Sequence, residues 1–174
     1  DSVHGPFPAP IKVDGNTISA NGTVVAFDSK YNSLAAGDTD NANDVFIRDI
    51  VAEVTTVIPC PVGTSCWFLD VSDSGDRVLF IAQSATNMPA SLRVFDRTGS
   101  VVTTIGEVRA HNEYNWYWVR AGAAMSADGH TVVWEPKVGN VMHQWVDGVD
   151  SPIAVFTTLA HHLSLSGSAT QVLY

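Results

Sequence analysis

One local pattern recurs four times along the chain: an apolar residue, Ser, two further residues, Gly and a short apolar run. Its copies begin at Ile18, Val71, Met125 and Leu163. Their glycines, which lie 53, 54 and 38 residues apart, are Gly22, Gly75, Gly129 and Gly167. Asn-Gly, Ser-Gly and Asp-Gly favour tight hairpin turns, because Gly adopts a positive φ without a Cβ clash. Each copy therefore predicts a strand, a turn and a second strand.

Two further β-rich segments follow each of the first three hairpins. The first of these ends at an Asp in every unit, and the three copies are 44–49, 92–96 and 143–147. The second lies a few residues later, at 54–58, 101–105 and 153–156. Four strands repeating at this period are typical of propeller blades. A β-sandwich is the alternative, but it does not need the same turn at the same place in every unit. No amphipathic helix of useful length is indicated.

We therefore expect an all-β chain made of β-propeller blades of four antiparallel strands, with three full blades and a partial one. The expected blades cover 17–58, 69–105 and 123–157, with a partial blade over 162–174 that 7–13 would complete as a closing strand. The chain, 1–174, is then a single propeller domain or a fragment of one. It forms either a small ring or part of a larger ring, because closed propellers have about four to eight blades.

The first unit also resembles a known family. Ile18 to Ser29, Leu34 to Asp40 and Asp44 to Asp49 are similar to a repeat of the TolB-type, WD-like β-propellers, and the later units are similar to a lesser degree. The resemblance covers about two-thirds of the chain. It implies a propeller that is usually extracytoplasmic and often a scaffold for protein or ligand contacts. It implies no single activity, because one fold carries many functions.

Composition narrows the function classes. The formal net charge is −9, and a phosphate backbone needs a basic surface, so we expect no nucleic-acid partner. No apolar run reaches the roughly 18 residues of a membrane helix, so we expect no membrane span. Cys60 and Cys66 flank a loop with a Pro and a Gly, which allows a disulfide and predicts a secreted or periplasmic protein. Two free thiols are the alternative.

An acidic segment separates the second and third strands of the first unit. Asp38, Asp40 and Asp44, with an amide oxygen of Asn41 or Asn43, offer the hard oxygen ligands that Ca²⁺ prefers. The spacing differs from that of an EF-hand. The alternative is that these residues cap turns through bonds from side chain to backbone. The sequence thus predicts a Ca²⁺ site at Asp38, Asp40, Asn41 and Asp44.

A segment rich in aromatic residues, 109–120, is the candidate binding site. Tyr114, Trp116 and Trp118 are suited to stacking on sugar rings or on a protein partner, and polar neighbours can add hydrogen bonds. His111 and Arg120 are the polar neighbours expected to form these hydrogen bonds. Packing inside the propeller is the alternative for these aromatic residues, and Trp134 and Trp145 fall within the repeat and are expected to be structural.

The long connections are expected on one face of the propeller, at 28–43, 59–68 and 106–122, while the opposite face carries only tight turns. Variable loops on a rigid scaffold are common binding sites. The predicted function is a secreted binding or scaffold module for a protein or a glycan. A second copy or another chain is the partner expected to complete the propeller. The alternative is a carbohydrate-active propeller, a lectin or a polysaccharide lyase. No nucleophile elbow, metalloprotease motif or phosphate loop occurs, so enzyme activity is not favoured.

Overall fold

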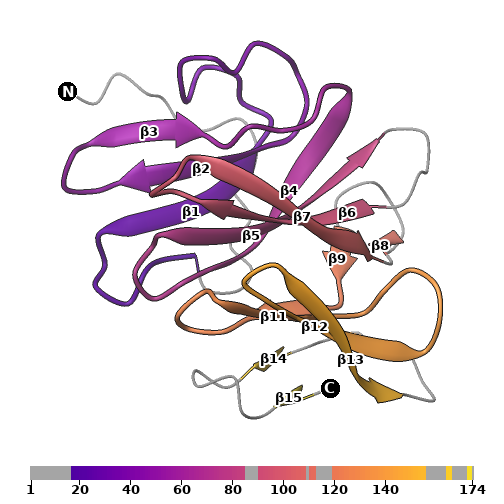
Figure 1. Ribbon diagram of the computed structural model, residues 1–174. Helices are drawn as coiled ribbons and strands as arrows, with labels where there is room; N and C mark the ends of the chain where they lie inside the picture. The colour runs from indigo at the N-terminus through magenta and orange to yellow at the C-terminus, as the bar shows by residue number, and fades with distance from the viewer. Residues whose placement is uncertain are drawn as a thin grey trace.

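The computed structural model describes residues 17–84, 90–108, 110–112, 119–155, 164–165 and 172–173. These residues form an all-β structure, as predicted from the repeat (Figure 1). The strands are β1 (Val24–Ser29), β2 (Asp44–Asp49), β3 (Val54–Val57), β4 (Thr64–Val71), β5 (Arg77–Ser84), β6 (Ala90–Asp96), β7 (Val101–Val108), β8 (Ala110–Asn112), β9 (Val119–Ala121), β10 (Ala123–Met125), β11 (Thr131–Trp134), β12 (Val141–Val146), β13 (Val149–Val155), β14 (Ser164–Leu165) and β15 (Val172–Leu173). In the described ranges, no helix has the length and apolar character needed to cross a bilayer.

The strands form antiparallel sheets in which chain neighbours are also neighbours in space. We call β1-β2-β3 blade 1, β4-β5-β6-β7 blade 2 and β10-β11-β12-β13 blade 3. Two short hairpins, β8-β9 and β14-β15, complete the described strands. In Figure 1 the blades follow one another in chain order, from the purple sheet through the magenta one to the orange one. This succession of antiparallel meanders confirms the predicted propeller blades, and the described sheets form an open arc.

The bounds of the blades differ in detail from those predicted. The first strand of blade 1 is reduced to a single bridge between Ile18 and Val25, so that its sheet has three strands. Blade 2 extends from Thr64 to Val108 and is longer than expected at both ends. The connection predicted over 59–68 is therefore shorter, and the residues between β3 and β4 are 58–63. The proposed closing strand, 7–13, lies outside the described residues.

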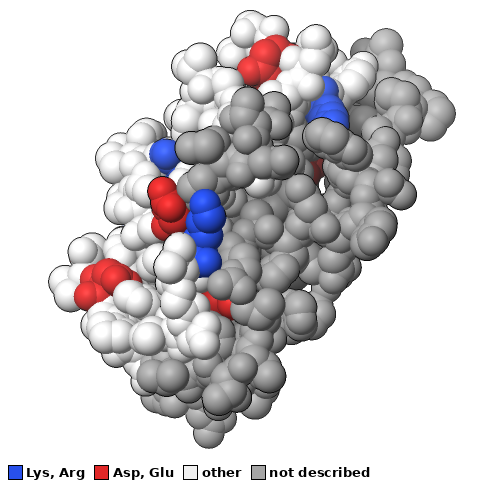
Figure 2. All heavy atoms as spheres, turned by 90° about the vertical axis from the view of Figure 1, so that its right-hand side faces the viewer, with Lys and Arg blue, Asp and Glu red and all other residues white. Residues whose placement is uncertain are grey.

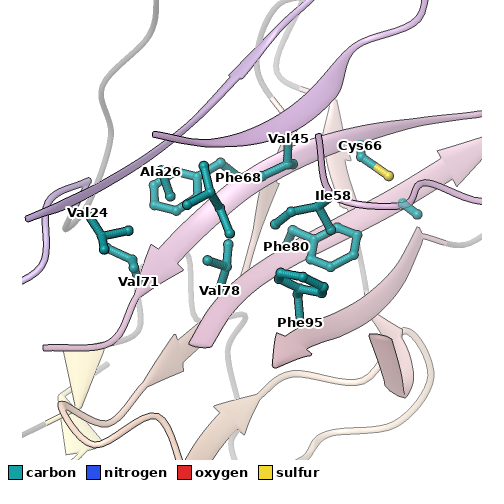
Figure 3. Packing of buried hydrophobic residues seen from close by; sticks show 12 residues of the cluster. Val24, Ala26, Val45, Ile58, Cys66, Phe68, Val71, Val78, Phe80 and Phe95 are labelled. Carbon is teal, nitrogen blue, oxygen red and sulfur yellow. The ribbon is translucent and has the colours of Figure 1, made fainter. Parts of the chain in front are cut away.

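Strand β5 explains how the blades stack. Its side chains alternate between two hydrophobic clusters, because successive residues of a strand point to opposite faces. Phe80 belongs to the cluster between blades 1 and 2, and Ile81 belongs to the cluster between blades 2 and 3; both are fully buried. Figure 3 shows Phe80 beside Ile58 and Phe95 in the first cluster. A strand buried on both faces is apolar throughout, and for this reason β5 lacks the polar alternation of a half-exposed strand.

The recurring hairpin turns link the blades at one end of the arc. The Ala20 amide donates to the Asp73 carbonyl at 2.9 Å, and the Asp73 amide donates to the Ala127 carbonyl at 2.8 Å. Gly75 lies in this row with a φ of 77°, and a Cβ there would stand 2.6 Å from the Val24 side chain. The repeated glycine therefore serves both the left-handed turn and the close approach of the neighbouring blade. We call this end the turn face and the opposite end the long-loop face.

Candidate functional site

The acidic segment brings three carboxylates together on the long-loop face. Asp38, Asp40 and Asp44 each present a carboxylate oxygen, and these oxygens all lie within 4.8 Å of one another. Asp44 is the first residue of β2, whereas the other two lie in the loop between β1 and β2. The Ala42 amide donates to Asp40 Oδ1 at 2.7 Å, a side-chain turn that folds the loop back toward β2. Three of the four residues predicted as ligands thus lie close together, and the calcium site itself stays a prediction.

The electrostatics of this cluster are those of an anion-rich site. Burial, followed by the charges of Asp38 and Asp40, raises the pKa of Asp44 to about 6. Burial and the charge of Asp40 also raise the pKa of Asp38. Asp44 is only 7% exposed, and its carboxylate makes no hydrogen bond within the described part of the chain. Asp38 Oδ1 is likewise buried without a hydrogen-bond partner there. A cation among these oxygens would offset both their burial and the mutual repulsion of the carboxylates.

Asn41, the fourth predicted ligand, lies on the exposed side of the loop. Asn43 was the alternative to Asn41 as a calcium ligand through its amide oxygen. It is buried, with 6% exposure, and contacts blade 2 instead. Its Nδ2 donates to the Cys66 carbonyl and to Asp28 Oδ2, both at 2.7 Å. Its carbonyl accepts a hydrogen bond from the Cys66 amide at 2.5 Å. Asn43 thus ties the acidic loop to β4.

The sequence did not indicate Asp28, and it indicated Asn43 only as an alternative amide ligand and not as a contact between blades. Asp28 follows the turn glycine of the first unit by six residues, and Glu135 occupies the same position in the third unit. Asp28 Oδ1 accepts from the Phe68 amide at 3.3 Å, so that this carboxylate spans two blades. Glu135 is 1% exposed, and both of its carboxylate oxygens lack a hydrogen-bond partner in the described structure. An acidic residue at a repeat position that is otherwise apolar was the available signal.

Cys60 and Cys66 form the disulfide that their spacing allowed, with Cα atoms 6.2 Å apart. Cys66 lies in β4 and is buried, whereas Cys60 lies in the connection from β3. The disulfide and the acidic segment therefore belong to the same end of the molecule, because Asn43 contacts Cys66 directly. Two of the three predicted long connections thus lie side by side.

The aromatic segment is described only in part. Tyr114, Trp116 and Trp118 lie outside the described residues. They stand in the chain between β8 and β9, which pair so that His111 is opposite Arg120. The segment predicted as a loop, 106–122, therefore contains the end of β7 and a short hairpin. The prediction of a binding surface at these residues stays a prediction.

The two tryptophans expected to be structural are buried. Trp134 and Trp145 are each 5% exposed and belong to the cluster between blades 2 and 3. The Trp134 ring lies against Gly106 of β7, where an added Cβ would stand 2.3 Å from the ring. The Trp134 ring also lies beside the His143 ring, with ring centroids 5.3 Å apart. Trp134 therefore fills the space that Gly106 leaves open.

Charged residues do not gather into a single patch in the described part of the face shown in Figure 2, where acidic and basic side chains form small separate groups. Two pairs of opposite charges link neighbouring blades. Arg97 of blade 2 pairs with Asp49 of blade 1, and Arg77 of blade 2 lies 3.4 Å from Asp147 of blade 3. Both aspartates end the third strand of a unit or follow it directly, so the repeated Asp serves contacts between blades on the turn face.

No protein-family model and no curated protein matches this chain. Solved structures do share its fold. An oligogalacturonate lyase in complex with manganese is similar with a TM-score of 0.53 and 12% identity, over 87% of this chain and 41% of the lyase. Hydrazine synthase of Kuenenia stuttgartiensis has a TM-score of 0.52 and 14% identity, over 89% of this chain and 53% of that chain.

A third structure is the β-propeller domain of the Trilobed protease from Pyrococcus furiosus, which has an open velcro topology. It is similar with a TM-score of 0.51 and 13% identity, over 86% of this chain and 45% of that chain. This chain spans about half or less of the length of these three structures. At such identities the similarity concerns the fold alone. Together with the blade topology, it places the chain in the β-propeller fold class.

Proposed function

We propose that this chain is part of an extracytoplasmic β-propeller of TolB type that acts as a calcium-stabilised binding or scaffold module. The cluster of Asp38, Asp40 and Asp44 carries the proposal, since their oxygens lie within 4.8 Å of one another. Ca²⁺ holds oxygen ligands at about 2.3–2.6 Å, so that opposite ligands stand about 5 Å apart. Mg²⁺ needs shorter distances of about 2.0–2.1 Å. Mg²⁺ is usually held by only one or two carboxylates, so the three carboxylates of this cluster favour Ca²⁺.

The experiment is a calcium titration followed by calorimetry and thermal unfolding. Ca²⁺ at about one hundred times its dissociation constant should add about 2.7 kcal/mol to the free energy of unfolding. The double variant Asp38→Ala, Asp40→Ala should lose both the heat of binding and the rise in Tm. Asp73→Ala is the matched control, because it removes an exposed carboxylate on the turn face. A wild-type chain that gives no calcium heat contradicts the proposal.

The disulfide supports the proposed location, because such bonds persist mainly in oxidising compartments such as the periplasm or the exterior. The relationship to TolB-type propellers rests on the repeat motifs of the first unit. Mass spectrometry of the natively produced chain, with and without reduction before alkylation, tests the location. Free thiols at Cys60 and Cys66 in that material would contradict it.

The proposed partner is a protein or a glycan bound on the long-loop face. The hairpin that pairs His111 with Arg120 supports this, since its connection carries the predicted aromatic residues. A glycan array and a crosslinking experiment separate the two kinds of partner. Propeller rings need about four to eight blades, and further blades of this or another chain would complete the arc. Native mass spectrometry reports the number of chains and any bound metal together.

A carbohydrate-active propeller is the second candidate, favoured by the fold shared with an oligogalacturonate lyase in complex with manganese. A β-elimination on an acidic sugar chain leaves an unsaturated product that absorbs in the ultraviolet. The chain is therefore incubated with oligogalacturonides, with and without Mn²⁺, and absorbance is followed. Activity that His111→Ala abolishes would support this candidate over the binding module.

A further inference from the structure

Asn43, the residue next to the acidic cluster, connects blades 1 and 2. Asp44 begins β2, and Asn43 immediately precedes it. The Asn43 carbonyl accepts from the Cys66 amide and its Nδ2 donates to the Cys66 carbonyl, at 2.5 and 2.7 Å. The Asn43 amide also points to Ser65 Oγ, at 3.4 Å. All three contacts lead from blade 1 to β4 of blade 2, so the backbone that positions Asp44 is fixed by the joint between these blades.

Asp28 completes this joint from the end of β1. One of its carboxylate oxygens accepts from Asn43 Nδ2 at 2.7 Å, and the other accepts from the Phe68 amide at 3.3 Å. Asn43 and Asp44 therefore have one geometry in which the joint is closed and the Asp44 carboxylate faces Asp38 and Asp40. A change in the position of Asp44 therefore acts directly on Asn43, its chain neighbour, which holds the two blades together.

The charges of the cluster oppose that geometry when no cation is bound, because three carboxylates within 4.8 Å repel one another. Asp38 Oδ1 is also buried without a hydrogen-bond partner in the described structure. A bound cation turns this repulsion into attraction and favours the position of Asp44 that the closed joint requires. By thermodynamic reciprocity, a closed joint must then favour the cation by the same factor.

We infer that cation binding at Asp38, Asp40 and Asp44 is coupled to closure of the joint between blades 1 and 2, with Asn43 as the positioning residue. The inference rests on the calcium site of the proposed function. It adds a regulatory consequence: Ca²⁺ in the surroundings sets how firmly the long-loop faces of two neighbouring blades are held together.

The joint between blades 2 and 3 provides an internal control. There the Lys137 amide donates to the Glu107 carbonyl at 2.9 Å. Among the described residues, the only cluster of three or more potential metal ligands is the one in blade 1. The residue that precedes β12 in blade 3 is Asn140, the repeat counterpart of Asn43, and it is exposed. It is thus a matched residue that makes no such joint.

Amide hydrogen exchange by NMR tests the inference on the unmodified, oxidised chain. Saturating Ca²⁺ should slow the exchange of the Cys66 and Phe68 amides about fivefold or more, in the range of ordinary coupling energies, and leave the Lys137 amide unchanged. Calorimetry on Asn43→Ala should show a calcium dissociation constant at least fivefold weaker than that of the wild type, whereas Asn140→Ala should match the wild type.

Two different outcomes distinguish a missing calcium site from a calcium site that is not coupled to the joint. If the wild-type chain gives no calcium heat, the calcium site itself is wrong and the inference falls with it. If calcium binds but the exchange of the Cys66 and Phe68 amides does not change, the site stands and the coupling is overturned. The exchange measurement needs no variant, so poor folding of Asn43→Ala leaves the test intact.

Discussion

The joint between blades 1 and 2 and the joint between blades 2 and 3 are alike on the turn face and differ on the long-loop face. On the turn face both are crossed by a backbone hydrogen bond between hairpin turns, by a close contact at the turn glycine and by an Arg–Asp pair. The repeat produces the hydrogen bond and the glycine contact, because each copy supplies the turn at the same position. The two arginines differ in position, since Arg97 follows β6 and Arg77 begins β5.

On the long-loop face the first joint is polar and the second is largely apolar. Asn43 and Asp28 cross the first joint with hydrogen bonds, beside a disulfide and three carboxylates. Trp134 fills the second joint against Gly106, and a bridge from Val108 to Pro136 lies nearby. The contacts that stack the blades lie on the turn face, so residues on the long-loop face are free to vary. The polar joint on the long-loop face is therefore the candidate site.

The largest expected effect concerns the apolar joint. Trp134→Ala should lower the free energy of unfolding by about 3–5 kcal/mol, the usual cost of emptying a buried aromatic site. Denaturant unfolding measures it. Hydrogen exchange of the Lys137 amide should accelerate more than that of the Cys66 amide. Equal acceleration at both amides would mean that the two joints are not separate units.

The turn glycines give the next effect. Gly75→Ala combines a left-handed backbone, at about 1 kcal/mol, with a clash against Val24 of the kind that costs about 1–3 kcal/mol. Gly22 has a similar φ of 71° but nothing within 4 Å of an added Cβ, so Gly22→Ala should show only the backbone cost. Equal unfolding midpoints for the two variants would contradict the described packing of blade 1 on blade 2.

Removing the disulfide should have a moderate effect. The loop it closes is short, and chain entropy predicts a loss of about 2 kcal/mol for Cys60→Ser, Cys66→Ser. Chemical denaturation of the oxidised and variant chains measures this loss. The variant should retain the hydrogen bonds between Asn43 and β4, because the backbone at position 66 remains paired with Ala82 in the sheet. A variant in which the Cys66 amide exchanges as in an unfolded chain would show that the disulfide alone holds the joint.

A further expected effect is a pH dependence at the apolar joint. Burial raises the pKa of Asp70 to about 6, although the Val71 and Met125 amides donate to it. A carboxyl with a raised pKa stabilises the fold fully below 3.8 and loses this contribution as the pH rises through about 6. The stability of the wild type relative to Asp70→Asn should therefore fall between these values. A constant difference would place Asp70 in a more solvated setting.

The sequence was sufficient to predict the blades, because the turn glycine and the strand that ends near an Asp recur with their neighbours and reflect local backbone chemistry. It also indicated the disulfide and the three carboxylates, which lie close together in the chain. It did not reveal that Asn43 and Asp28 connect blades 1 and 2. Their hydrogen-bond partners, Cys66 and Phe68, are tens of residues away and belong to another sheet. It also did not show that Gly106 makes room for Trp134, since that contact depends on how two blades pack.

The most direct test of the polar joint as a cation site is diffraction from crystals grown with Ca²⁺, recorded at a wavelength where calcium scatters anomalously. The account predicts one anomalous peak about 2.3–2.6 Å from carboxylate oxygens of Asp38, Asp40 and Asp44, with Asn43 still bonded to Cys66. A calcium-soaked crystal with no peak there, or with these carboxylates turned apart toward solvent, would contradict it.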